Sequence, residues 1–269
     1  MGSPFSFYQT LSASMPIFPF HIKLSLRRQW MRTYLSKFYD RYFRLSGVFL
    51  LLLCAACVAP DRDALKKSGN NIVLLNPESG LGDDWEHRRL RRADTSYETV
   101  ETGLGHTIRA TGNQSASILY RLFEPTGPEC NRLRWSWFVQ NPQPGSDLHS
   151  KGRDDVAASV FVMFGDPGIF QDNPVPTLKY AWANSRHQKD EIIVGPYQEK
   201  YIRTWILRAG GSTAQVLVTE TVNLREDYLT AFGEAPENGV YGVALFTDND
   251  DTREPIVAHY GKIELLCNE

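Results

Sequence analysis

Short runs rich in β-branched and aromatic residues recur along the chain, and glycine and proline separate them, as at residues 167–168, 195–196 and 210–211. This pattern is typical of an all-β sandwich or barrel. The expected strands cover residues 107–111, 116–123, 132–139, 156–164, 178–183, 200–207, 214–222, 240–247 and 256–266. Only residues 224–233 are typical of a helix, which Gly233 would close. We therefore predict two antiparallel sheets packed face to face, with one short helical segment.

Residues 44–57 form an apolar stretch that follows several basic residues. The stretch is shorter than the ~20 residues that a membrane-spanning helix needs, so it indicates a signal peptide. We expect translation to start at Met31, because basic residues of a normal signal follow it. The sequence thus predicts a signal region over residues 1–57, a polar tether over 58–82 and a β-sandwich domain over 83–269.

The signal region ends in a sequence typical of lipoprotein cleavage, because the small residues Ala55 and Ala56 precede Cys57. We expect Cys57 to receive the lipid. Cys54 occupies the position where this motif usually has leucine, so cleavage without lipidation remains an alternative. A lipid on Cys57 would anchor the protein to a membrane of the bacterial cell envelope, and we expect the periplasmic face of the outer membrane.

The charge of the expected mature chain limits its partners. Residues 1–57 hold seven of the 29 basic and one of the 31 acidic residues, which leaves 22 basic and 30 acidic residues in the remainder. Such an acidic body argues against binding nucleic acid.

Two cysteines, Cys130 and Cys267, remain after the signal region. In an exported protein an even pair favours a disulfide over a metal site, and no further zinc ligands lie near either residue. The bridge would join the last strand to an early one.

Alternation along a strand assigns side chains to its two faces. Glu220 falls in line with Val216, Val218 and Val222, so its carboxylate must either have a structural partner or serve function. Trp135 and Trp137 share a face of their strand, and we expect both in the core because large aromatic residues dominate core burial.

The segments 133–139, 151–164, 178–183, 221–233, 243–252 and 260–263, taken in order, resemble the DUF3047 family of bacterial exported proteins of unknown function. The resemblance extends from about Trp85 to Leu265. It implies an envelope protein with a jelly-roll-like sandwich that resembles carbohydrate-binding modules. Ser136 and Ser159 depart from the family pattern, which usually has basic residues there, and this departure weakens any role for an anionic ligand.

The segment T-D-N-D-D-T at residues 247–252 directly follows an apolar run. Asp248 and Asp250 would lie on one side of an extended backbone, and Ca²⁺ binds through six to eight such oxygen ligands. A calcium site that stabilises this loop is one reading. A turn whose Asp and Asn side chains bond their own backbone is another, and catalysis is the third.

Catalysis on a glycan would need two carboxylates, one protonated and one ionised. The candidates are Glu220, Asp155, Asp227 and Asp248, and an apolar environment could raise the pKa of Glu220. Nothing in the spacing shows that two of them converge. The histidines are scattered, and no known nucleophile or phosphate-binding motif is present.

Aromatic residues that could stack on sugar rings favour binding over catalysis. Tyr201, Arg203 and Trp205 share one side of their strand, which suggests a mixed surface for a ligand. The full set of expected ligand-binding residues is Tyr180, Trp182, Tyr201, Arg203, Trp205, Asp155 and Glu220. We predict an envelope lipoprotein that binds a glycan. The alternatives are a glycan-active hydrolase or lyase that uses Glu220 with an aspartate, and a scaffold that binds another envelope component.

Overall fold

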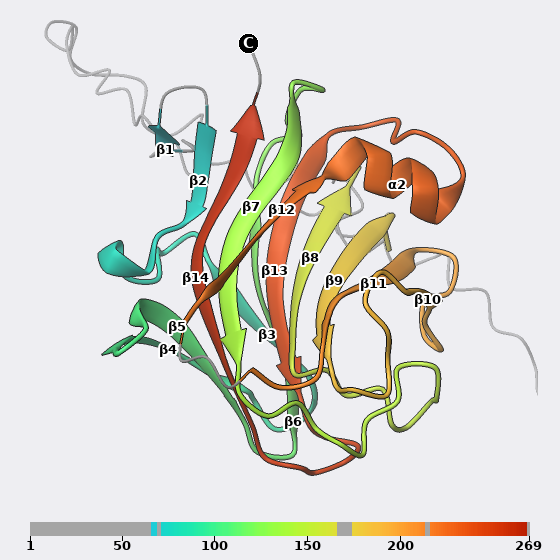
Figure 1. Cartoon of the computed structure of the whole chain (residues 1–269). Helices are drawn as coiled ribbons and strands as arrows, with labels where there is room; N and C mark the ends of the chain where they lie inside the picture. The colour runs from blue at the N-terminus through green and yellow to red at the C-terminus, as the bar shows by residue number, and fades with distance from the viewer. Residues whose placement is uncertain (1–65, 69–70, 166–173, 213–215, 268–269) are drawn as a thin grey trace, which may run out of the picture. The chain divides into compact units, whose positions relative to one another are not determined.

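The computed structural model describes residues 66–68, 71–165, 174–212 and 216–267, and this part of the chain confirms the predicted all-β class (Figure 1). Its strands form two seven-stranded sheets. The predicted start at Met31 and the predicted lipidation site at Cys57 lie outside the described residues. Among the residues described, no helix is long and apolar enough to cross a membrane.

The first sheet, sheet A, is built around the long strand β14. The first half of β14 pairs with β5 and its second half with β2, while β7 pairs along its other edge. Strands β1, β4 and β12 extend the sheet from β2, β5 and β7. The bounds are β1 Lys66–Ser68, β2 Asn71–Leu75, β4 Ser96–Thr102, β5 Gly105–Gly112, β7 Cys130–Val139, β12 Val218–Asn223 and β14 Ile256–Cys267.

The second sheet, sheet B, has the strand order β10-β11-β9-β8-β13-β6-β3. The bounds are β3 Glu86–Arg92, β6 Ser115–Leu122, β8 Ala158–Phe164, β9 Thr177–Ala183, β10 Ile192–Val194, β11 Ile202–Ala209 and β13 Val240–Asp248. One pair departs from the predicted antiparallel arrangement, because β9 and β11 run parallel. Residues 184–201 carry the chain back between these two strands, as a parallel pair requires.

The predicted tether over residues 58–82 is wrong for its second part. Asn71–Leu75 forms β2, which pairs with β14, and Leu74 and Leu75 are buried in the core. A 3₁₀ turn over Pro77–Ser79 follows. The physical reason is the apolar run of residues 72–75, whose burial favours a place in the sheet.

The main core lies between the two sheets and is rich in tryptophan. Trp135 and Trp137 are fully buried, as the sequence predicts. Their rings meet edge to face with centroids 5.4 Å apart, and Trp137 packs in the same way on Trp182 of β9 at 5.6 Å. Tyr180 of β9 packs on Trp135 at 5.4 Å.

The predicted helix is present as α2, Leu224–Phe232. The side chain of Asn223 accepts a hydrogen bond from the backbone N–H of Glu226 at its start. Gly233 ends it with φ 84°, a left-handed conformation that glycine adopts without steric cost. Tyr228 is buried on the inner side of the helix, where its ring lies 4.8 Å from that of Phe164.

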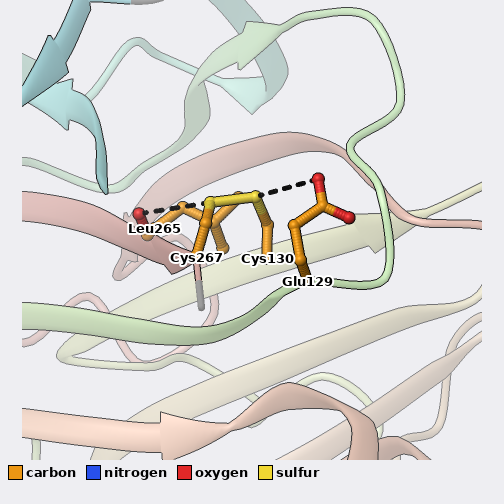
Figure 2. Close-up of a disulfide and its surroundings, with 4 residues drawn as sticks. All are labelled: Glu129, Cys130, Leu265 and Cys267. Atoms are coloured by element: carbon orange, nitrogen blue, oxygen red, sulfur yellow. Dashed lines mark hydrogen bonds between the residues drawn. A yellow bond between two sulfur atoms is a disulfide. The ribbon is translucent and has the colours of Figure 1, made fainter. Parts of the chain in front are cut away.

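A disulfide joins Cys130 to Cys267, the two cysteines that the sequence pairs (Figure 2). Cys130 is the first residue of β7 and Cys267 the last of β14, and the two are register partners in sheet A. The bridge therefore ties the end of the described domain to a central strand, across 137 positions of sequence.

Candidate functional site

The outer face of sheet B, which points away from sheet A, carries a second apolar cluster. Its buried members are Ala116, Leu148, Val156, Ala181, Ala183, Ile193, Ile206 and Phe246, with Ile118 and Phe161 partly buried against them. Leu148 and Val156 come from the segment that connects β7 to β8, so this connection covers part of the face. Sheet B is thus apolar on both faces.

A cavity of about 250 Å³ remains on this outer face. Its floor includes Phe161 of β8, Lys179 of β9, Thr204 of β11 and Phe246 of β13. Its walls include Leu90 and Arg91 of β3, residues 195–197, and the acidic residues Asp154, Asp248, Asp250 and Asp251. Aromatic, cationic and anionic side chains therefore surround one small space.

Lys179 lies at the centre of this arrangement. Its Nζ is 5.5 Å from the ring centroid of Phe161 and 5.3 Å from that of Phe246. Burial lowers the pKa of Lys179, and the carboxylates of Asp248 and Asp154 oppose this shift. The rings and the acidic groups thus hold a positive charge at the cavity floor.

Tyr197 supplies a third ring to the cavity. The guanidinium carbon of Arg91 lies 5.3 Å from its ring centroid, and Nζ of Lys151 lies 4.8 Å from it. These contacts hold a partly exposed aromatic ring at the cavity.

The acidic wall forms where β13 ends and β8 begins. Oδ1 of Asp248 accepts a hydrogen bond from the backbone N–H of Val156 at 2.7 Å. Asp155 accepts from the backbone N–H of Thr252 at 2.7 Å and from its hydroxyl at 2.6 Å. Carboxylate oxygens of Asp155, Asp248 and Asp250 all lie within 4.8 Å of one another.

Burial raises the pKa of Asp248 well above its usual range, and the positive charge of Lys179 partly offsets this effect. The pKa of Asp250 is also raised, first by burial and then by the nearby Asp251 and Asp155. Like charges held together in a buried place explain both shifts.

The segment T-D-N-D-D-T begins as the end of β13 and becomes a turn at residues 250–252, as the turn reading predicts, but Asp248 bonds the backbone of the distant Val156 and not its own. Asn249 holds it: its Oδ1 accepts from the backbone N–H of Ser115 at 3.0 Å, and its Nδ2 donates to the carbonyl of Glu254 at 2.9 Å. The same turn brings Asp248 and Asp250 together, as the calcium reading requires, and adds Asp155 to them. Whether an ion binds there stays a prediction.

Two of the predicted sugar-binding residues are core residues instead. Tyr180 and Trp182 are 0% and 3% exposed. Tyr180 donates its hydroxyl to Oδ2 of Asp227 at 2.7 Å, and Trp182 donates Nε1 to the carbonyl of Gly210 at 2.7 Å. The prediction failed because the largest aromatic rings of β9 face sheet A, where their burial stabilises the fold most.

Tyr201, Arg203 and Trp205 do share a side, but it is the side opposite the cavity. The residues of this strand region that line the cavity are Ile202 and Thr204. Trp205 packs against the main core, and Arg203 donates Nε to the carbonyl of Ala231 at the end of α2. Arg203 and Trp205 are therefore structural residues, and Tyr201 does not line the cavity.

Glu220 has structural partners as well. Its Oε1 accepts from Nε of Arg208 at 2.6 Å and from Nε1 of Trp137 at 3.2 Å. Asp227 accepts from Tyr180, and burial raises its pKa while that hydrogen bond opposes the shift. Neither carboxylate lines the cavity, so the reading of Glu220 and Asp227 as catalytic or ligand-binding groups is not supported. Asp155 does not line the cavity either, but it lies beside the predicted calcium ligands Asp248 and Asp250.

A second group of possible metal ligands, His149, His187 and Glu191, was not expected from the scattered histidines. Nε2 of His187 accepts from the backbone N–H of Leu148 at 3.1 Å, so its proton lies on Nδ1. That Nδ1 faces Glu191 at 3.3 Å, and Nε2 of His149 lies 2.7 Å from the other oxygen of Glu191. Hydrogen bonds within the group account for its geometry.

The sequence did not indicate the cavity residues Phe161, Lys179, Tyr197 and Phe246, among others. One signal could have revealed Lys179: it alternates with Tyr180 and Trp182, so it must face the other side of β9.

The model of the family described as "Protein of unknown function (DUF3047)" matches residues 83–264. No curated protein matches the chain.

Three solved structures illustrate the fold-level similarity. The family 11 carbohydrate-binding module of a cellulosomal cellulase of Clostridium thermocellum is 6% identical with a TM-score of 0.40, and the match covers 75% of this chain and 97% of that chain. A cleaved adhesin domain of Lys-gingipain from Porphyromonas gingivalis is 12% identical with a TM-score of 0.41, and the match covers 75% of this chain and 100% of that domain. The family 11 xylanase from Neocallimastix patriciarum is 13% identical with a TM-score of 0.32, and the match covers 74% of this chain and 94% of the xylanase chain. At these values the similarity carries no argument about the ligand.

Proposed function

Since the chain belongs to the DUF3047 family, whose function is unknown, we propose its function from the cavity itself: the protein binds a carbohydrate on the outer face of sheet B. The observation that carries this proposal is the combination of aromatic rings and carboxylates around one cavity. We propose that the protein does so in the bacterial cell envelope, the compartment that the sequence predicts.

The rings of Phe161, Phe246 and Tyr197 offer flat apolar surfaces to the cavity. A sugar ring has C–H groups on its faces and hydroxyls around its rim. Flat rings can pack on those faces, while nearby carboxylates accept hydrogen bonds from the hydroxyls. The cavity provides both kinds of group at once, as specific small-ligand sites do.

The volume of the cavity, about 250 Å³, limits the length of the ligand. Pockets for drug-sized ligands typically measure about 300–1,000 Å³. A site slightly below that range suits a short segment of a glycan or the end of a chain. We therefore propose recognition of one or two sugar units.

The charge around the cavity selects among glycans. Four aspartates line it against two cations, Arg91 and Lys179. Because like charges repel in a partly buried site, this wall disfavours carboxylated or sulfated sugars and accepts neutral or amino-substituted ones.

Affinity electrophoresis tests this proposal. The purified protein is run through native gels that contain neutral, amino-substituted or acidic polysaccharides, with calcium present. We expect at least one neutral or amino-substituted glycan to retard it. The retardation should persist at 0.5 M salt, where the Debye length of about 4 Å would screen a purely electrostatic attraction. Migration unchanged by every glycan, or retardation by acidic glycans alone, would contradict the proposal.

A further inference from the structure

Three buried carboxylates converge at one end of the cavity from two distant parts of the chain. Asp155 precedes β8, whereas Asp248 ends β13 and Asp250 lies in the turn that follows. They are 1%, 7% and 3% exposed, and their oxygens lie within 4.8 Å of one another. Three ionised carboxylates in so small a buried volume repel one another unless a cation compensates them.

One oxygen of this group has no hydrogen-bond partner. Oδ2 of Asp250 is buried and accepts no hydrogen bond from any described residue. Nε of Arg92 lies 3.7 Å from this oxygen, beyond hydrogen-bond distance. A buried oxygen without a partner costs free energy, so this atom indicates that a ligand completes the site.

The protein's own cations do not balance the group. Lys179 interacts with Asp248 and Asp155, and Arg91 and Arg92 act on Asp250. Asp154 and Asp251 add two more carboxylates to the group, so three cations face five acidic groups, and negative charge stays uncompensated when all five are ionised.

We propose that Asp155, Asp248 and Asp250 bind one divalent cation of the calcium class. The donor set contains only oxygen, which suits a hard cation and not zinc, whose sites prefer nitrogen or sulfur ligands. Two oxygens bound to one Ca²⁺ at about 2.4 Å can be at most about 4.8 Å apart, and the observed spacing meets this limit.

Hydrogen bonds hold two of the ligands in place before any ion arrives. The backbone N–H of Val156 orients Asp248, and Thr252 orients Asp155 through its N–H and its hydroxyl. Such support fixes the oxygen positions, and water would complete the coordination shell. Since Asp248 and Asp250 also line the cavity, the ion reaches solvent from there.

Isothermal titration of the chelator-treated protein with CaCl₂, without any glycan, tests the proposal independently of carbohydrate binding. We expect saturable binding of one ion per chain and a rise in melting temperature with calcium. Asp250→Asn should weaken the affinity by about tenfold or more, because it removes a charged ligand while keeping the side-chain shape. Asp251→Asn is the matched control: it removes the same charge beside the site without removing a ligand, so it should weaken the affinity clearly less than Asp250→Asn does.

A second variant keeps the test decisive if Asp250→Asn does not fold. Lys179→Met removes a competing positive charge and should tighten calcium binding. The absence of heat and of any melting shift up to 10 mM calcium, about the weakest range of calcium modules, would overturn the proposal. Equal weakening by Asp250→Asn and Asp251→Asn would also overturn it, because it would show a diffuse attraction of calcium to the acidic surface without specific ligands. Weaker binding in Lys179→Met would overturn it as well, because Lys179 would then not compete with the ion.

Discussion

Replacing Trp137 by alanine should lower the free energy of unfolding by about 3–5 kcal/mol, the range observed for large aromatic truncations in cores. Trp137 is fully buried and packs edge to face on Trp135 and Trp182. The substitution removes these contacts, leaves a cavity between the sheets and takes a hydrogen-bond donor from Glu220.

Urea denaturation of wild type and variant, with the disulfide intact, measures this loss. Leu229→Ala is a suitable control, because Leu229 is 50% exposed on α2 and its truncation should cost no more than about 0.5–1 kcal/mol. A loss below about 1 kcal/mol for Trp137→Ala would show that the tryptophan cluster is not the centre of the core.

Removing the disulfide should be comparably destabilising, by about 2–5 kcal/mol. The bridge closes a loop between residues 137 positions apart, and a loop of that length restricts the unfolded chain strongly. The double variant Cys130→Ala/Cys267→Ala should therefore unfold at a lower urea concentration than the oxidised wild type.

Reductant provides the internal control for this prediction. Dithiothreitol should lower the unfolding midpoint of the wild type to that of the double variant, and it should leave the double variant unchanged. Equal midpoints for the oxidised wild type and the double variant would show that the bridge does not constrain the unfolded chain.

Much of the fold was predictable because local rules and global packing agree in it. Turn residues separated the strands, Asn223 and Gly233 bounded the helix, and paired tryptophans on one face of β7 indicated a core position. The two cysteines left after the signal region indicated the disulfide. Each inference rested on interactions between residues close in sequence or, for the disulfide, on the fact that only two cysteines were left to pair.

Strands without apolar alternation were not predictable in this way. β3 consists of Glu86–Arg92, and every side chain in it is exposed, because it forms the edge of sheet B next to β6. Its basic sequence carries no core-facing pattern, so only its pairing with β6 identifies it as a strand. Such an edge position, with many charges, also protects a sheet from pairing with other chains.

The binding face was assigned to the wrong side because alternation separates two faces without saying which of them points to the core. On β9, Tyr180 and Trp182 alternate with Lys179 and Ala181, and the aromatic side was interpreted as the ligand surface. Since sheet B is covered on both faces, neither side was plainly polar. The convergence of Asp155 with Asp248 depends on the long-range pairing of β8 with β13, which no local pattern contains.

A matched pair of tyrosines four positions apart tests the central claim, that the cavity and not the opposite face of sheet B binds the carbohydrate. Tyr197 and Tyr201 are both partly exposed and each has a lysine ammonium over its ring, yet only Tyr197 lines the cavity. The measurement is the dissociation constant of wild type, Tyr197→Ala and Tyr201→Ala, by isothermal titration with an oligosaccharide of the retarding glycan. We predict that Tyr197→Ala weakens binding by about tenfold or more and that Tyr201→Ala leaves it within about twofold. Equal losses, or a larger loss for Tyr201→Ala, would contradict the account.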